Sequence, residues 1–124
     1  MPYEIKWEEN GVVAQFSGIF DYEVNKAANC DVWEDPRCDN IKYAIWDATG
    51  ISELVIPLDN FYVLAMQDHA GSPRLPALKL AMVAKDRQIR RYFEKYTANF
   101  YNQKTNWHFM VSASIEKVRS WIAS

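Results

Sequence analysis

The sequence predicts an α/β domain with a mixed, mostly parallel sheet of five strands, and three observations lead to this fold class. Segments in which apolar and polar residues alternate, as in strands, are interleaved with segments whose apolar residues recur at helical spacing. The first two strand-like segments flank an Asn-Gly pair, which indicates a hairpin. The later strand-like segments are separated by helices, and such connections join parallel strands. The chain therefore fits one domain, residues 1–124, with the order β-β-α-β-α-β-α-β-α.

An antiparallel hairpin is expected at the start of the chain. Apolar and charged residues alternate through residues 3–7, and residues 12–16 form a second, apolar strand. Asn10-Gly11 lies between them and predicts a tight turn in which both central residues have positive φ. Gly18 is expected to end the second strand.

A helix and a central strand are expected next. Asp21 suits the N-cap or the first turn of the helix, where its charge favours the helix dipole. Asp35-Pro36 ends the helix, because the residue before a proline avoids helical backbone angles. Residues 42–46 are apolar on both faces, which indicates an internal strand. Asp47 would lie at the carboxyl end of this strand, and residues 48–50 would turn the chain out of the sheet.

The rest of the chain is expected to alternate between helix and strand. The expected segments are a helix from Pro57 to Gly71, a strand at 77–84, a helix capped by Asp86, a strand at 107–111 and a last helix capped by Ser112 or Ser114. The helix after Pro57 is apolar around much of its girth. It is therefore either deeply buried or in contact with a partner on its outer side.

Composition excludes several classes of function. A net charge of −2 argues against binding of nucleic acid that depends mainly on electrostatic attraction. No apolar run approaches the roughly 20 residues of a transmembrane helix, and the charged start is unlike a signal peptide. Two cysteines and two scattered histidines form neither a disulfide framework nor a plausible zinc site. We therefore expect a cytoplasmic protein without a metal or other cofactor.

Taken in order, these segments resemble STAS domains, and most closely the bacterial SpoIIAA-like branch of that family. The resemblance covers nearly the whole chain and depends on the order and spacing of short motifs. These motifs are Gly18-Ile19-Phe20-Asp21, Asp35-Pro36-Arg37, Asp47-Ala48-Thr49-Gly50-Ile51, Leu80-Ala81-Met82-Val83-Ala84 with Asp86, and Trp121-Ile122. The resemblance implies a β-α superhelix, a core that CRAL-TRIO lipid-carrying domains share.

The resemblance also implies a mechanism of regulation. STAS proteins regulate partners such as anti-sigma kinases through a phosphorylatable serine in an Asp-Ser-Ser-Gly turn at the start of the second helix. The corresponding stretch here is Ile56-Pro57-Leu58-Asp59, which contains no Ser, Thr or Gly. No phosphorylation site is therefore carried over to this chain.

Candidate binding residues gather at the predicted carboxyl edge of the sheet, where ligands of parallel sheets bind. Asp47 and Thr49 follow one strand, and Asp86 and Arg87 follow the next. Asp47 has two possible roles: it positions a ligand or a protein partner, or it only accepts hydrogen bonds from the turn that follows it. Asp86 either joins the site or only caps its helix. Arg87 and Arg90 lie near the positive end of that helix, where they either hold a phosphate or carboxylate or form a solvated face.

Two functions are favoured by these features, and we expect neither to be enzymatic, because no catalytic motif is present. An enzymatic function is left as a third alternative, since a fold does not determine its function. The first is a STAS-like interaction module that binds a protein partner, or itself as a homodimer, through the sheet and the helix carrying Tyr62 and Met66. The alternative is a carrier or sensor of a small apolar or amphipathic ligand. Aromatic residues such as Trp46 and Tyr62 would line its pocket, and Lys79 or Arg90 would anchor an acidic head group.

Overall fold

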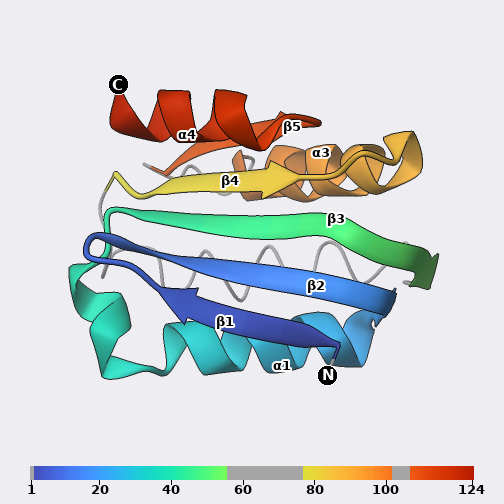
Figure 1. Ribbon diagram of the computed structural model, residues 1–124, viewed down its shortest axis with the longest axis horizontal. Coiled ribbons are helices and arrows are strands. Elements are labelled where there is room, and N and C mark those ends of the chain that lie inside the picture. The colour runs from blue at the N-terminus through green and yellow to red at the C-terminus, as the bar shows by residue number, and fades with distance from the viewer. Residues whose placement is uncertain (1, 56–76, 102–106) are drawn as a thin grey trace.

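The computed structural model describes residues 2–55, 77–101 and 107–124. These residues form a five-stranded sheet in the order β1-β2-β3-β4-β5, with helices on both faces (Figure 1). The elements are β1 (Tyr3–Trp7), β2 (Gly11–Asp21), α1 (Tyr22–Trp33), the 3₁₀ helix η1 (Pro36–Asn40), β3 (Tyr43–Val55), β4 (Lys79–Val83), α3 (Arg87–Tyr101), β5 (His108–Ser112) and α4 (Ile115–Ala123).

The strand pairing confirms the predicted fold class. β1 pairs with β2 in the antiparallel sense, and the pairs β2–β3, β3–β4 and β4–β5 are parallel. The order of the strands in space is also their order in the sequence. The first half of the chain therefore builds one side of the molecule, and the second half builds the other side (Figure 1).

The sheet separates two hydrophobic clusters, as expected for strands that are apolar on both faces. On one face, α1 packs against β1 and β2 while α3 packs against β4 and β5. Ala44 and Trp46 of β3 belong to the cluster on this face. Ile45, between them in sequence, points to the other face and packs with Val118 of α4. Each fully buried aliphatic side chain of this size contributes about 1.5–3 kcal/mol to folding.

The predicted hairpin is present, but the predicted turn type is wrong. Glu8 N–H donates to the Gly11 carbonyl at 2.8 Å, and neither Asn10 nor Gly11 has positive φ. Gly11 is needed for another reason. It pairs with Tyr43 of β3, and a side-chain methyl group at this position would overlap the Tyr43 ring. The glycine therefore allows close packing across the sheet, and the turn does not depend on its conformational freedom.

β2 and β3 are both longer than predicted. Gly18 was expected to end the second strand, but β2 continues through it with φ of 73° and register shifts on both sides of this residue. Residues 48–50 do not leave the sheet, because β3 stays paired with β2 as far as Val55. A glycine can adopt the positive φ of a β-bulge without strain, so it bends a strand without ending it.

Other predicted boundaries are close to those observed. Asp21 caps α1, since its Oδ1 accepts a hydrogen bond from Val24 N–H at 2.9 Å. Ser114 caps α4 through Lys117 N–H at 3.2 Å. The segment between α1 and β3 forms η1. The helix expected after Pro57 lies outside the described residues. Among the helices that are described, none is long and apolar enough to cross a membrane.

Candidate functional site

β2 and β3 continue past the strands that lie beside them. β1 pairs with β2 as far as Phe16, and β4 pairs with β3 as far as Asp47. Beyond these positions, residues 17–21 pair with residues 50–55, and no other strand of the described chain joins them. We call these two segments the exposed ribbon; it forms the right-hand end of the sheet in Figure 1.

The two faces of the exposed ribbon differ. Phe20 and Leu54 lie opposite each other and pack on the larger hydrophobic cluster. The other face carries Ile19, which is 53% exposed, and Val55, which is 49% exposed. These two are the large hydrophobic side chains that are exposed in the described part of the chain. They occupy diagonal positions of the two strands, since Ile19 pairs with Glu53 and Val55 pairs with Asp21. Exposed apolar side chains grouped on one face favour a contact surface.

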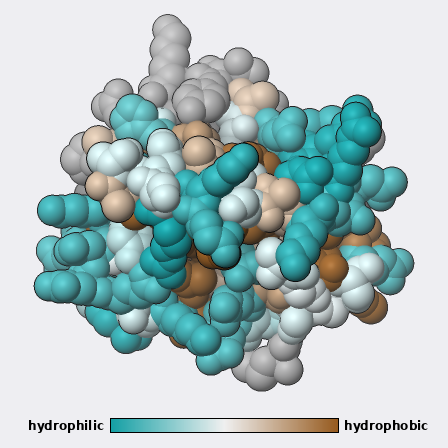
Figure 2. Space-filling view, turned by 45° about the horizontal axis from the view of Figure 1, so that its top comes forward, coloured by the Kyte–Doolittle hydropathy of each residue, from teal (hydrophilic) through white to brown (hydrophobic). Residues whose placement is uncertain are grey.

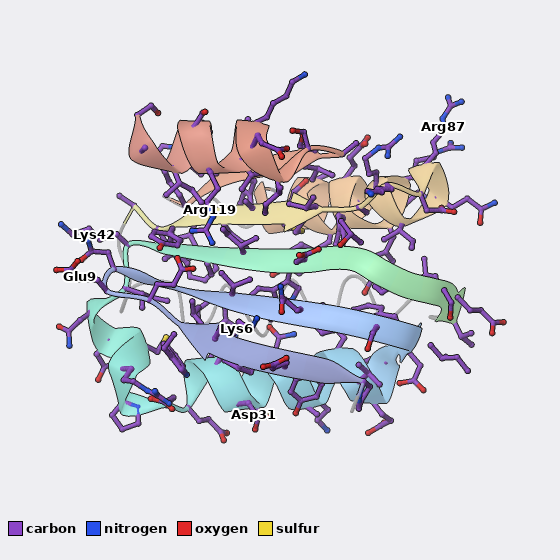
Figure 3. The ribbon with its side chains drawn as sticks, viewed as in Figure 1. Lys6, Glu9, Asp31, Lys42, Arg87 and Arg119 are labelled. Carbon is purple, nitrogen blue, oxygen red and sulfur yellow. The ribbon has the colours of Figure 1, made fainter. Side chains whose placement is uncertain are left out.

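Polar side chains surround the apolar face of the ribbon. α4 contacts β4 and β5, while β1, β2 and β3 turn residues such as Lys6, Gln15 and Asp47 toward solvent on the same face of the sheet. Lys6 projects from the middle of the part of this face that α4 does not cover (Figure 3). Hydrophilic side chains cover most of the surface shown in Figure 2, with smaller hydrophobic areas between them. The ribbon is therefore a small apolar patch with a polar rim.

Asp47 and Thr49 form a local pair at the base of the ribbon. Both the N–H and the Oγ1 of Thr49 donate to Asp47 Oδ1, at 3.0 Å and 2.7 Å. This is the hydrogen bonding expected under the turn interpretation of Asp47, although it occurs here within an extended strand. A direct role of either residue in binding remains a prediction.

Asp86 caps α3. Its Oδ1 accepts hydrogen bonds from Gln88 N–H at 2.7 Å and from Ile89 N–H at 3.2 Å. Arg87, the first residue of α3, is exposed and points away from the body of the molecule (Figure 3). The carboxylate of Asp86 is therefore directed to the helix backbone, and the guanidinium of Arg87 to solvent.

Arg90 and Lys79, the two predicted anchors for an acidic group, donate to backbone carbonyls. Arg90 Nη1 lies 2.9 Å from the Ala84 oxygen and 2.7 Å from the Lys85 oxygen. Lys79 Nζ lies 2.9 Å from the oxygen of Trp121, near the end of α4. Since Lys79 begins β4 and Arg90 follows its carboxyl end, the structure does not bring the two anchors together.

Trp46 belongs to the core. It is 5% exposed, and its ring stacks on Trp33 with centroids 5.8 Å apart. A cavity of about 20 Å³ beside these rings is lined by Asn25, Asn29, Trp33, Trp46, Leu80, Met82, Tyr92, Phe93 and Tyr96. This volume suits about one water molecule, whereas pockets for small ligands span roughly 300–1,000 Å³. The other two predicted binding residues, Tyr62 and Met66, lie outside the described residues.

Glu8 joins the hairpin to α4. Its carboxylate accepts two hydrogen bonds from Arg119, at 2.7 Å and 2.8 Å, and a further one from the Tyr43 hydroxyl. The hydrogen bonds from Arg119 lower the pKa of Glu8 to about 2. Burial and the hydrogen bond to Glu8 raise the pKa of Tyr43. This cluster holds α4 on the sheet, and Arg119 reaches from the helix toward the strands (Figure 3).

A larger hollow of about 210 Å³ lies beside the same hairpin. Its lining residues are Trp7, Glu8, Glu9, Arg37, Asn40 and Ile41. Arg37 lies 4.6 Å from the centre of the Trp7 ring and forms an ion pair of 2.8 Å with Asp35. Its guanidinium thus binds groups of this chain. In the described residues, no three His, Cys, Asp or Glu side chains are grouped to hold a metal ion.

Two features of this surface were not predicted from the sequence. Ile19 and Val55 were missed because Gly18 and Gly50 were interpreted as breaks, although strand-like residues follow each glycine. The contact between Glu8 and Arg119 joins residues 111 positions apart, and neither residue belongs to a local motif.

The sequence matches no model of a protein family and no curated protein. Solved structures do match. The anti-sigma factor antagonist SpoIIAA, in its unphosphorylated form, superposes with a TM-score of 0.62 over 98% of both chains at 11% identity. The chain has the SpoIIAA-like fold. A protein of the DUF3478 family from Shewanella loihica PV-4, described as having a SpoIIAA-like fold, matches with a TM-score of 0.53 and 12% identity, over 97% of this chain and 91% of the other.

The SpoIIAA-like fold confirms the resemblance predicted from the order of the motifs. At 11–12% identity the likeness concerns the path of the backbone. Function therefore has to be argued from the surface of this chain, because one fold supports many functions.

Proposed function

We propose that the protein is a non-enzymatic regulatory module that binds a partner protein through the exposed ribbon. The observation that carries the proposal is the pair of exposed apolar side chains, Ile19 and Val55, on strands that extend past their neighbours. SpoIIAA, which shares the fold, is an antagonist of another protein, an anti-sigma factor. The proposal therefore assigns to this chain the same general kind of activity.

The chemistry of the ribbon suits a reversible protein contact. Ile19 and Val55 would form the apolar centre of the interface, while Asp21 and Glu53, paired with them across the strands, would lie at its polar rim. Asp47 and Thr49 at the base of the ribbon would extend that rim. Because the apolar centre is small, we expect a transient complex and not a permanent one.

Substitution of the apolar centre tests the proposal. Ile19→Asp combined with Val55→Asp places two charges where the partner would bury methyl groups, so we expect loss of at least about 2 kcal/mol of binding free energy, or roughly thirtyfold in affinity. The tagged protein and its variant are purified from the cells that produce them. The bound proteins are identified by mass spectrometry, and the affinity of each is then measured with purified components.

The matched control is Ala27→Asp, which adds a charge at an exposed position of α1. A partner that binds the wild type and this control, but not the ribbon variant, supports the proposal. A partner that binds all three proteins equally well contradicts it, provided that circular dichroism shows the variants to be folded.

A further inference from the structure

The charges of this chain are divided between its two halves. Residues 1–55 contain eleven Asp and Glu residues against four Lys and Arg residues, a net charge of −7. Residues 77–124 contain nine Lys and Arg residues against three acidic ones, a net charge of +6. The small total of −2 thus hides two large and opposite charges.

The topology turns this division along the sequence into a division in space. Since the strands lie side by side in chain order, the acidic half forms the β1 and α1 side of the molecule. The basic half forms the side with β4, β5, α3 and α4. Asp31 on α1 and Arg87 on α3 project from opposite sides of the molecule in Figure 3.

The acidic side is defined by the exposed carboxylates of β1 and α1 and of the residue after α1. Its members are Glu4, Glu23, Asp31 and Glu34. Lys26 of α1 and Lys6 of β1 are exposed basic residues of these elements, so the four carboxylates outnumber the basic groups by two. The Tyr3 hydroxyl donates a hydrogen bond to Asp31. The surface of α1 therefore carries a net negative charge.

The basic side is defined by exposed basic residues just before α3 and along its first nine residues. Its members are Lys85, Arg87, Arg91 and Lys95. Arg87, Arg91 and Lys95 are spaced by four positions, so they form one stripe along the helix. Asp86 and Glu94 reduce this positive charge but do not cancel it, and Asp86 is turned to the helix backbone.

We propose that the acidic side of one copy of the protein binds the basic side of a second copy, head to tail. The two sides are complementary in charge, because the chain itself provides surfaces of opposite sign on opposite sides of the molecule. A symmetric dimer through either side would place like charges against each other, which is destabilising. A head-to-tail contact joins unlike charges. The resulting pair of copies keeps one free acidic side and one free basic side. It is independent of the exposed ribbon and adds a second binding surface.

The contact is expected to be weak and sensitive to salt. Exposed ion pairs each contribute roughly 0–1 kcal/mol, and the Debye length falls from about 30 Å at 0.01 M salt to about 3 Å at 1 M. We therefore expect association at low ionic strength and high protein concentration, and dissociation at high ionic strength.

Charge reversal tests the proposal by sedimentation velocity. In the acidic-side variant, Glu23→Lys and Glu34→Lys give the protein two basic sides. In the basic-side variant, Arg87→Glu and Arg91→Glu give it two acidic sides. Each variant alone should associate at least about tenfold more weakly than the wild type, because like sides repel. An equimolar mixture of the two variants should form complexes at low salt that high salt dissolves.

Control variants carry a charge reversal at positions outside both sides. Lys42→Glu is the control for the basic-side variant, and Glu9→Lys is the control for the acidic-side variant. A mixture of these two controls should associate no better than either control alone. Lys42 and Glu9 lie at the hairpin end of the sheet, away from both Asp31 and Arg87 (Figure 3).

Two results would overturn the proposal. In the first, both the wild type and the mixture of the two side variants remain monomeric at low salt up to about 1 mM protein. The other is a dimer that forms equally well with the side variants and with the controls, since it would have to use another surface. The variant Ile19→Asp with Val55→Asp should associate like the wild type. Failure of the head-to-tail contact is therefore distinguishable from failure of the proposed ribbon function.

Discussion

At the scale of single residues, Glu8 connects the two ends of the chain. It belongs to the hairpin loop, and its carboxylate binds Arg119 of α4 and the hydroxyl of Tyr43 in β3. Because the hydrogen bonds from Arg119 favour the ionised form, the pKa of Glu8 falls from its ordinary value of 4.5 to about 2. A lowered pKa means that this contact stabilises the fold above pH 4.5 and that the stabilisation is lost as the pH falls toward 2.

Glu8→Gln is therefore expected to lower stability in a pH-dependent way. At pH 7 the loss should be about 0.5–1 kcal/mol, since the ion pair is partly exposed to solvent. Thermal unfolding followed by circular dichroism should show the difference from the wild type shrinking between pH 4.5 and about 2. Glu9→Gln, at an exposed neighbouring position, is the control. A difference that stays constant down to pH 2 would show that Glu8 does not act through its charge.

Single residues also show where prediction from the sequence fails. Asn10-Gly11 correctly indicates a hairpin, but the reason for the glycine is the ring of Tyr43, which lies on a different strand. Asp21 and Asp86 are recognised as helix caps because the carboxylate and the amides it accepts from are close in sequence. A residue whose role depends on a distant partner gives no such local signal.

At the scale of elements, α4 is held at its end by a strand. Lys79 Nζ donates to the carbonyls of Trp121 at 2.9 Å and of Ser124 at 3.2 Å, and it lies 5.4 Å from the centre of the Trp121 ring. The last carbonyls of a helix lack partners within the helix, so a cation near them stabilises its final turn. This contact fixes the end of α4 over the start of β4.

Lys79→Met should loosen the last turn of α4 while leaving its hydrophobic contacts. The expected loss is on the order of 1 kcal/mol, which corresponds to about fivefold faster amide exchange in that turn. Hydrogen–deuterium exchange measured by mass spectrometry provides the test. Lys85→Met, at an exposed position after β4, is the control. Unchanged exchange in α4 of the Lys79 variant would contradict the role given to this lysine.

Element types were more predictable than element ends. The alternation of β1 and the apolar runs of β2 and β3 indicate strands, and all three are present. The extensions of β2 and β3 beyond Gly18 and Gly50 were not predicted, because a glycine can mark either a turn or a bulge. Pairing between β2 and β3 decides in favour of a bulge, and pairing is a property of two segments that no single segment reveals.

At the scale of the whole molecule, the fold was predictable and the binding surface was not. The order of elements along the chain and the mixed sheet follow from the sequence of patterns, and the SpoIIAA-like fold confirms them. The predicted site residues are dispersed: Trp46 lies in the core, Lys79 holds α4, and Arg90 holds the connection before α3. Among the predicted site residues that the structure describes, Asp47 and Thr49 lie beside the ribbon that we propose as the binding surface.

The central claim, a module that binds a protein and not a small ligand, can be tested most directly by native mass spectrometry. The untagged protein is purified gently from the cells that produce it, and its mass is measured before and after collisional activation. We expect complexes with a second polypeptide of a different mass, which are absent from the Ile19→Asp, Val55→Asp variant, and no release of a small molecule. A monomer that carries a few hundred daltons and loses them on activation would contradict the account and favour a ligand carrier.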